Sequence, residues 1–265
     1  MGTASRGTGR KLGRLPHDPA KVARCVQAHD ILNLSTLPSR PVARDWSQKD
    51  GVYFAYPMFR NNALGICVIA SLLHKFITSA GQTGTPFAAT DADATEGYEK
   101  FGGFVEGDPS TDNGCVMLDV VKRLAKGETL AGQTIKAFVA VNPKNLDLMA
   151  AVCEFFGGIW MGWDLPLAWQ GADEWGVSPT GSTSGKWAPA SWGRHATLDP
   201  KWSPLLTGVE TWTEDVAVTL PAVPVYGSEA YAIILDHQWT VLTGDKCPAG
   251  VDVQKLIDLL PVVGG

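Results

Sequence analysis

The stretch FRNNALGICVIASLLHKF, residues 59–76, decides how the first half of this 265-residue chain folds. Its apolar residues recur every three or four positions, at Val68, Ile69, Leu72, Leu73 and Phe76. This spacing predicts a buried helix with Cys67 in its first turn and a stop near Gly81. Backbone N–H groups at a helix start stabilise a thiolate, but free cysteines are also often simply buried. Cys67 is therefore either a nucleophile or an ordinary core residue, depending on its partners.

The composition bounds the class of protein. Apolar residues make up 45% of the chain and charged residues 18%, which is enough to fill a real core. The formal net charge of -5 gives no general attraction to nucleic acid or to an anionic membrane, so we expect neither as a partner. No run of eighteen apolar residues and no signal-peptide pattern occurs, which favours a soluble, cytoplasmic or virion-associated protein. Five cysteines without a CxxC pair indicate neither a disulfide scaffold nor a zinc motif.

The patterns change character along the chain. Residues 1–20 are rich in Gly, Arg and Lys and predict a disordered basic tail, followed over 21–45 by a short helix and an extended arm. Residues 46–133 predict a mainly helical lobe and residues 134–265 a β-rich lobe, which together form one module. Between the later strands, residues 167–193 hold four tryptophans among Gly, Ser and Pro, as expected of a functional or lining loop.

A nucleophilic cysteine needs a base, and the histidines can be screened by position. His74 lies roughly 10 Å along the same helix from Cys67, too far to accept the thiol proton. His17 and His29 have no supporting motif, which leaves His195 and His237. His195, in SWGRHATLD, follows the Trp-rich loop at the start of an expected strand, where it can face the rim of a cleft.

Several of these residues together resemble a known family. The stretch DWSQKDGVYFAYPMFRNNALGICVIAS, residues 45–71, resembles the start of mature papain-like cysteine peptidases, with an Asp-Trp pair and then Gly-x-Cys at a helix start. RHA at 194–196 resembles the family's His-Ala, and ETW at 210–212 its Asn-Ser-Trp. The resemblance covers residues 46–236. It implies an α+β, two-lobed fold with a cleft between the lobes.

The resemblance also implies roles for individual residues. These are Cys67 as nucleophile, His195 as base, Asn61 as oxyanion donor, Glu210 or Thr211 as the residue that orients His195, Trp212 as its shield, and Gly65 and Trp192 beside the pocket. Asn61 stands where the family has glutamine, and Glu210 or Thr211 where it has asparagine. The sequence leaves the choice between Glu210 and Thr211 open. The run after His195 contains Pro200 and Pro204, which predicts that any pairing there lies at a sheet edge.

Two functions follow from this resemblance. The first is a cysteine peptidase or amide hydrolase that acts on a peptide or isopeptide and requires no metal or organic cofactor. The second is a catalytically inactive papain-like scaffold that serves as a binding or structural subunit with a protein partner, for example in a phage particle. The substituted amide at Asn61 and the missing asparagine favour the second.

Overall fold

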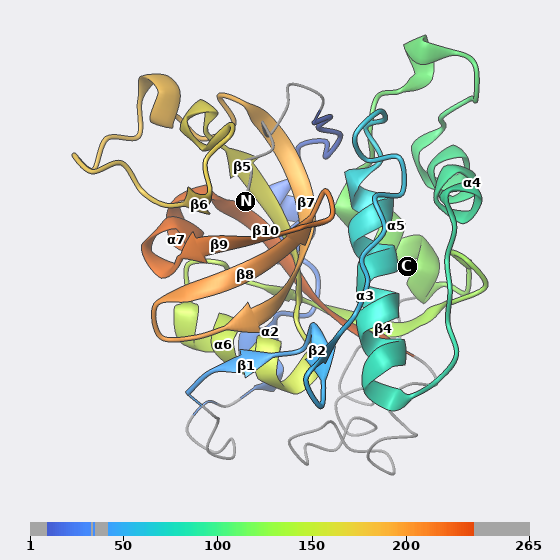
Figure 1. Ribbon diagram of the computed structural model, residues 1–265, viewed down its shortest axis with the longest axis horizontal. Coiled ribbons are helices and arrows are strands. Elements are labelled where there is room, and N and C mark those ends of the chain that lie inside the picture. Colours follow the sequence, from blue (N-terminus) through green and yellow to red (C-terminus); the bar gives the residue numbers. More distant parts are fainter. Residues whose placement is uncertain (1–9, 33, 35–41, 236–265) are drawn as a thin grey trace.

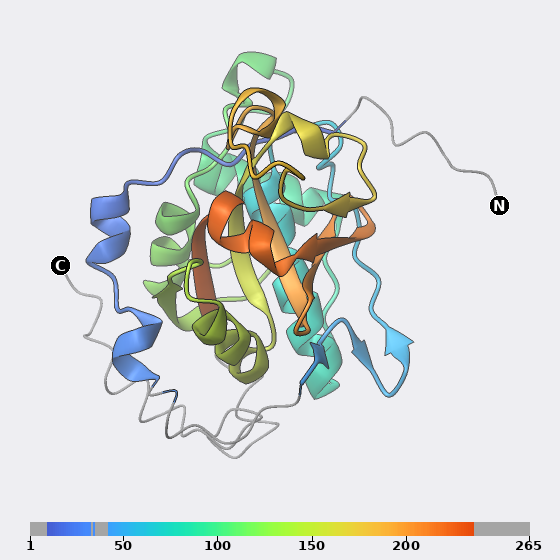
Figure 2. The ribbon, with the colours of Figure 1, turned by 90° about the vertical axis from the view of Figure 1, so that its left-hand side faces the viewer.

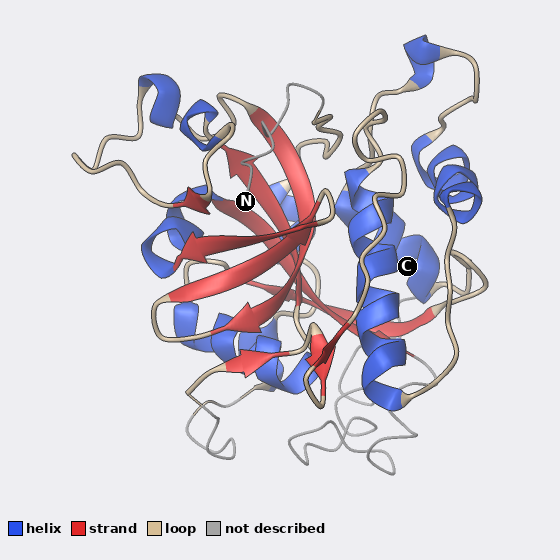
Figure 3. Ribbon diagram, viewed as in Figure 1, coloured by secondary structure: helices blue, strands red, loops and turns tan. Residues whose placement is uncertain are grey.

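A computed structural model describes residues 10–32, 34 and 42–235. The helices α3, α4 and α5 gather on one side of the molecule, and a large sheet with α2, α6 and α7 around it forms the other, as Figures 1 and 3 show. The predicted α+β fold class is confirmed. Within the residues that the structure describes, no helix has the length and apolar character needed to cross a membrane.

The central helix α3 spans Cys67–Thr83 and begins at the predicted cysteine. Most of its surface is buried, including polar residues such as His74 and Lys75, and it ends at Gly84, just beyond the predicted stop at Gly81, in the left-handed conformation typical of a helix stop. The helices α4, Asp91–Gly102, and α5, Met117–Ala125, complete this side. A capping box at Thr90 fixes the start of α4. The N-terminal end of α3, with Cys67, lies buried in the protein.

The eight-stranded sheet has the order β4-β10-β5-β7-β8-β9-β6, with β1 paired to β7. Its strands are β1 Arg44–Asp45, β4 Ile135–Val141, β5 Ile159–Leu165, β6 Glu174–Trp175, β7 Gly193–Trp202, β8 Leu206–Thr211, β9 Glu214–Thr219 and β10 Gly227–Leu235. Only β6 and β9 run parallel among these pairs. The strand that carries His195, β7, lies next to α3 and faces it (Figure 1).

The expectation that Pro200 confines its strand to an edge is wrong. The strand β7 pairs with β5 on one side and with β8 on the other. Pairing with β5 ends at Asp199, and the register with β8 shifts between Leu198 and Lys201, so no ladder bond is needed from Pro200. Its carbonyl still accepts a hydrogen bond from the Trp46 N–H at 3.0 Å. A bulge therefore admits a proline inside the sheet.

The remaining elements complete the described part of the chain. They are α1 Pro19–Ala23, α2 Ala28–Ile31, β2 Gln48–Lys49, β3 Val52–Tyr53, η1 Pro109–Thr111, α6 Leu146–Phe156, η2 Leu167–Trp169, η3 Gly185–Trp187, η4 Leu220–Ala222 and α7 Val223–Tyr226. The helix expected in residues 21–32 is two short helices, α1 and α2, separated at residues 24–27.

The disordered tail expected over residues 1–20 is wrong for residues 10–20, which have a defined path and include a buried residue, Arg14; residues 1–9 lie outside the described part. Arg14 is only 3% exposed, and α1 begins at Pro19 after an N-cap at Asp18. In Figure 2 the dark-blue chain that precedes α1 crosses the top of the molecule. Its place relative to Cys67 is described below.

The Trp-rich region, residues 167–193, does not form a simple lining loop. Trp169 and Trp175 are buried and stack on each other with ring centroids 4.9 Å apart. The Trp169 indole N–H donates to the carbonyl of Gly176 at 2.8 Å, which closes this part of the chain on itself. These two rings are core residues, because burying an indole removes a large apolar area from water.

Candidate active site

Cys67 is the first residue of α3 and is fully buried. Its sulfur lies within reach of the backbone N–H groups of Ala196 and Gly13. Burial raises the pKa of Cys67, and those N–H groups and the nearby charge of Arg14 oppose the rise only in part. The structure therefore holds a protonated thiol directly beside the residue that follows His195.

His195 lies on β7 and is fully buried. Its Nε2 is 2.6 Å from the Thr211 hydroxyl oxygen, and its ring stacks on Trp212 with centroids 4.0 Å apart. The other ring nitrogen, Nδ1, is buried and has no hydrogen-bond partner among the described residues. Burial, followed by the positive charges of Arg14 and Arg10, lowers the pKa of His195 well below its usual value. The imidazole is therefore neutral, with one nitrogen held and the other available.

The structure distinguishes between the two candidates for orienting His195. Thr211 makes the contact, whereas the carboxylate of Glu210 lies 3.2 Å from the Lys201 ammonium. Successive residues of a strand point to opposite faces, so only one of the two can face the imidazole. Burial raises the pKa of Glu210 to about 7, although Lys201 opposes the rise. Thr211 is the residue in place to orient the ring.

Asn61 lies in the loop that leads to α3 and is 3% exposed. Its side-chain oxygen is buried and has no partner among the described residues. The two preceding residues, Phe59 and Arg60, adopt positive φ angles of 51° and 59°, which L-residues rarely do. A loop held in this uncommon conformation fixes where the Asn61 amide lies.

His74, which position alone excluded as a base, supports that loop. Its Nε2 is 2.8 Å from the carbonyl oxygen of Pro57, which makes this nitrogen the donor. Its ring also packs on Phe59, with centroids 5.5 Å apart. Burial lowers the pKa of His74 to about 4, so it stays neutral at neutral pH. It anchors the Asn61 loop to α3.

Gly65 and Trp192, the two residues expected beside the pocket, contact different parts of the protein. The Gly65 N–H donates to the Asp112 carboxylate at 2.8 Å, and the same oxygen accepts from the Tyr98 hydroxyl at 2.7 Å. Trp192 packs on Trp212 with centroids 5.7 Å apart. Gly65 therefore belongs to the Cys67 side of the arrangement and Trp192 to the His195 side.

Comparisons with known proteins agree with this geometry. No family model and no curated protein sequence matches the chain. Among solved structures, xylellain, a cysteine protease from Xylella fastidiosa, is similar over 89% of this chain and all of its own, with a TM-score of 0.60 and 12% identity. Digestive procathepsin L2 proteinase from Tenebrio molitor is similar over 86% of this chain and 79% of its own, with a TM-score of 0.58 and 13% identity.

The chain has the papain-like fold. The resemblance noted in the sequence is thus confirmed at the level of fold. At 12–13% identity, the similarity carries no statement about activity.

A segment that the sequence resemblance did not include lies at the junction of the two halves of this papain-like fold. We call residues 10–15 the N-terminal segment. The Cys115 N–H donates to the Gly13 carbonyl at 2.9 Å, and the Leu15 N–H donates to the Cys115 carbonyl at 2.8 Å. On the other side, the Arg14 N–H donates to the Arg194 carbonyl at 3.3 Å. The segment therefore bridges the helical half and β7, next to His195.

Glycines bring the N-terminal segment close to the thiol. A Cβ on Gly13 would lie 1.9 Å from the carbonyl oxygen of Gly65, and a Cβ on Gly114 would lie 1.9 Å from the carbonyl oxygen of Gly13. Such contacts are impossible for any larger residue without moving the backbone. The main chain of Gly13 therefore lies in close contact with the main chains of Gly65 and Gly114. Its N–H lies near the sulfur of Cys67.

Each basic residue of the segment pairs with a carboxylate. Arg10 pairs with Glu214 at 2.5 Å and covers the Trp212 ring, 4.8 Å from its centroid. Lys11 pairs with Asp112, the residue that holds Gly65. The sequence carries no periodic signal for these contacts, because a short run of Gly, Arg and Lys is typical of a solvated tail.

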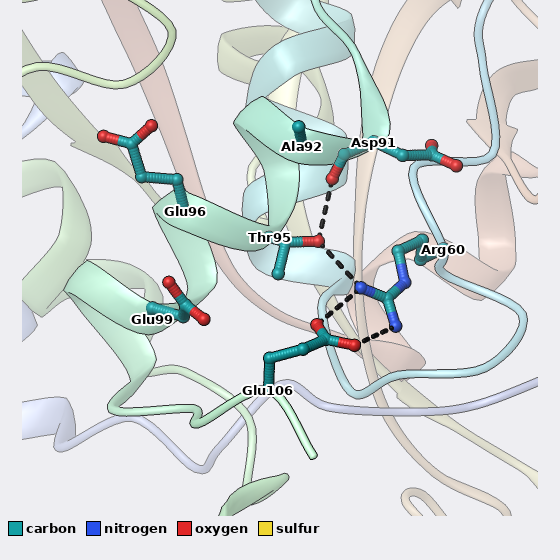
Figure 4. A pocket seen from close by; sticks show the side chains of 7 residues that line it. All are labelled: Arg60, Asp91, Ala92, Thr95, Glu96, Glu99 and Glu106. Atoms are coloured by element: carbon teal, nitrogen blue, oxygen red, sulfur yellow. Dashed lines mark hydrogen bonds and ion pairs between the residues drawn. The ribbon is translucent and has the colours of Figure 1, made fainter.

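A recess elsewhere on the surface contains none of the predicted residues. It is lined by Arg60, Asp91, Ala92, Thr95, Glu96, Glu99 and Glu106 (Figure 4). Arg60 pairs with Glu106 at 2.7 Å and donates to the Thr95 hydroxyl at 3.1 Å, so its charge is already matched. Over residues 10–32, 34 and 42–235, no group of His, Cys, Asp and Glu side chains is placed to hold a metal ion.

Proposed function

We propose that the chain is a cysteine peptidase or amide hydrolase in which Cys67 is the nucleophile and His195 the base. One observation carries the proposal. The Cys67 sulfur lies against the peptide N–H of Ala196, the residue that follows a histidine held by Thr211 and stacked on Trp212. A thiol, an imidazole and a third group that orients the imidazole form the arrangement that activates a nucleophile. The proposed substrate is a peptide or isopeptide.

In the proposed reaction the thiol proton moves from Cys67 to His195 as the sulfur attacks the carbonyl carbon. The C–S bond forms, and the carbonyl oxygen becomes an oxyanion. The imidazolium then gives its proton to the leaving amine, the C–N bond breaks, and a thioester remains. Water, deprotonated by His195, hydrolyses the thioester, releases the carboxylic acid and restores the thiol.

The proposed oxyanion donors are the Cys67 backbone N–H and the Asn61 side-chain amide. A first-turn N–H of a helix has no intrahelical acceptor, so that of Cys67 remains free for a ligand. The Asn61 amide can donate as glutamine does, from a side chain one methylene shorter. The loop conformation at Phe59 and Arg60 supports this role, because it fixes the position of Asn61.

The alternative is an inactive papain-like scaffold that binds a partner or forms part of a larger assembly. The full burial of Cys67 and its raised pKa favour this alternative, because a sealed, protonated thiol is a poor nucleophile. The N-terminal segment lies beside the thiol, with the Gly13 N–H near the Cys67 sulfur, and we propose that it contributes to this burial, although Gly13 and Arg14 themselves oppose the rise in the pKa of Cys67. A variant in which the segment is displaced therefore distinguishes the hydrolase from the inactive scaffold, because only the hydrolase should then have a reactive Cys67.

Alkylation by iodoacetamide, mapped to single cysteines by mass spectrometry, tests the proposal. It is measured in the wild type and in Gly13→Ala, whose methyl group cannot share space with Gly65. In the Gly13→Ala background we expect Cys67 to react faster than the other thiols, and His195→Ala to slow it about 100-fold at neutral pH. Cys67→Ala identifies the labelled peptide.

Thr211→Val and Glu210→Gln form a matched pair in the same background. We expect Thr211→Val to slow alkylation of Cys67 about tenfold, because the imidazole loses its orienting hydroxyl, and Glu210→Gln to change it little. The proposal is lost if Cys67 reacts no faster than the other cysteines and His195→Ala leaves its rate unchanged. The inactive scaffold then remains.

A further inference from the structure

Arg14 places both terminal nitrogens of its guanidinium group among buried acceptors, while its Nε is buried without a partner among the described residues. Its side chain is fully buried, and Nη1 donates to Glu229 at 2.6 Å. Nη2 donates to the Ser228 hydroxyl at 2.8 Å and to the Trp163 carbonyl at 3.2 Å, and it pairs with the Asp164 carboxylate. We call these four acceptors the guanidinium pocket.

The pocket is formed by the protein and not by the arginine. Glu229 is fully buried, and its second oxygen accepts from the Tyr231 hydroxyl at 2.8 Å, which fixes the carboxylate on β10. Gly162 leaves room for the arginine stem, since a Cβ there would lie 2.7 Å from Glu229 and 3.0 Å from Arg14. A buried carboxylate without a cation is costly, so the pocket selects for a positive group.

The same stretch of backbone connects the pocket to the thiol. Gly13, the neighbour of Arg14, has its N–H near the Cys67 sulfur. Both hydrogen-bonding groups of Cys115 are used by the segment, and the carbonyl of Arg194 is used as well. A free peptide that reaches Cys67 has to replace these contacts, and its side chain then enters the guanidinium pocket.

We infer that the guanidinium pocket is a substrate pocket, that it takes an arginine side chain of the peptide to be cleaved, and that Arg14 occupies it in competition with that substrate. This inference rests on the proposed function and names its substrate class. Glu229 is the residue that determines specificity, because it is the fully buried charge. Asp164, with a side chain 23% exposed, contributes at the rim.

The test uses full-length Arg14→Ala, in which the pocket is vacated, and two probes of nearly identical shape. N-acetyl-arginine amide carries the guanidinium, and N-acetyl-citrulline amide carries a neutral urea in its place. By calorimetry we expect the arginine probe to bind Arg14→Ala at least tenfold more tightly than the citrulline probe. We also expect it to slow iodoacetamide labelling of Cys67 in that variant.

Two further variants identify the pocket. Arg14→Ala/Glu229→Gln should lose the preference for arginine over citrulline, and Arg24→Ala should bind neither probe. Arg24 is an exposed arginine of the same region with no side-chain partner among the described residues, so its loss vacates no pocket. Thermal unfolding checks that each variant folds. Should Arg14→Ala fail to fold, Arg14→Lys, whose single ammonium fills the pocket less well, takes its place.

The outcomes separate this inference from the proposed function. Equal binding of the two probes, or an unchanged preference after Glu229→Gln, overturns the arginine pocket even if Cys67 is a reactive thiol. Arginine-selective binding with an unreactive Cys67 supports the pocket as a binding site but overturns it as a substrate pocket, together with the proposed function. Arginine-selective binding and faster cleavage of arginine than citrulline peptides support both.

Discussion

The His195 side of the site and the N-terminal segment that covers it are held by different forces. His195 is fixed by ring packing and one neutral hydrogen bond, through Trp212 and Thr211. Trp212 in turn packs on Trp175 and Trp192, which joins the site to the aromatic core. The segment is held mainly by main-chain hydrogen bonds and by three basic side chains paired with carboxylates, with Leu12 as its apolar contact to the core.

This difference indicates which of the two regions stays in place while the protein is folded. Removing His195 or Trp212 from its packing exposes buried apolar area, which a folded protein resists. Removing the segment breaks contacts that another peptide with the same polar groups can restore. The first region is therefore part of the core, and we propose that the second is an occupant that another peptide can displace. Three predictions test that division, from the largest expected effect to the smallest.

Gly13→Ala is expected to displace the segment without unfolding the protein. The new methyl group would lie 1.9 Å from a main-chain oxygen of Gly65, and no side-chain rotation relieves such a contact. We expect iodoacetamide labelling of Cys67 to become about 100-fold faster, the factor that about 3 kcal/mol represents. The measurement is the labelling rate, alongside thermal unfolding.

Gly176→Ala is the matched control for this change. A Cβ on Gly176 would meet its nearest neighbour, the Thr219 hydroxyl, at 3.5 Å, which is ordinary van der Waals contact. Its labelling rate should equal that of the wild type. An unchanged rate in Gly13→Ala, with folding intact, would show that the segment does not limit access to the thiol.

The pKa of His195 should rise when the segment is displaced. Burial is the largest cause of its lowered pKa, and Arg14 and Arg10 add to it, so Gly13→Ala relieves all three. Because the folded-state pKa is lowered, the unfolded chain binds the proton first as pH falls. Stability is therefore complete above the ordinary histidine pKa and is lost as pH falls below it. The loss should be smaller in Gly13→Ala.

Histidine ring signals followed by NMR against pH measure this change, with urea unfolding at several pH values as the second readout. His74 serves as the internal reference, since its pKa of about 4 arises mainly from its own burial. It should titrate alike in both proteins. If His195 also titrates alike in both, the segment is not responsible for keeping the imidazole neutral.

The sequence predicts the parts of the fold that repeat or match a motif. The apolar period placed Cys67 in the first turn of a buried helix, and the structure has it as the first residue of α3. The RHA and ETW motifs placed His195 and Trp212, which the structure brings together in a stack. Roles in catalysis for these residues stay predictions.

The parts that the sequence did not predict depend on register and on distant partners. Whether Glu210 or Thr211 faces His195 depends on how β8 pairs with β7, and that register shifts between Leu198 and Lys201. The same shift explains how Pro200 sits inside the sheet. A one-residue change of register exchanges the two faces of a strand, and composition does not reveal it.

The N-terminal segment could not be predicted for a second reason. Its contacts reach residues far along the chain, such as Glu214 and Glu229, and none leaves a periodic trace. Charge alone made it resemble a solvated tail. Its position depends on carboxylates that distant parts of the chain supply, as the acceptors around Arg14 illustrate.

Salt should loosen the segment by a smaller amount than Gly13→Ala does. The pairs Arg10–Glu214 and Lys11–Asp112 each include a side chain that is at least 29% exposed, whereas Arg14 and Glu229 are fully buried. Raising NaCl from 0.1 M to 1 M shortens the screening length from about 10 Å to about 3 Å, which weakens the two outer pairs most. Exposed pairs contribute about 0.2–1 kcal/mol each, so we expect labelling of Cys67 to become about twofold to thirtyfold faster.

The double variant Arg10→Ala/Lys11→Ala separates screening from other effects of salt. Without the two outer pairs, its labelling rate should already be raised at 0.1 M NaCl and should respond little to more. A wild-type rate that salt leaves unchanged would mean that the outer pairs do not hold the segment. The buried contacts of Arg14 would then be what fixes the segment. Whether another peptide can displace the segment would then depend on the guanidinium pocket.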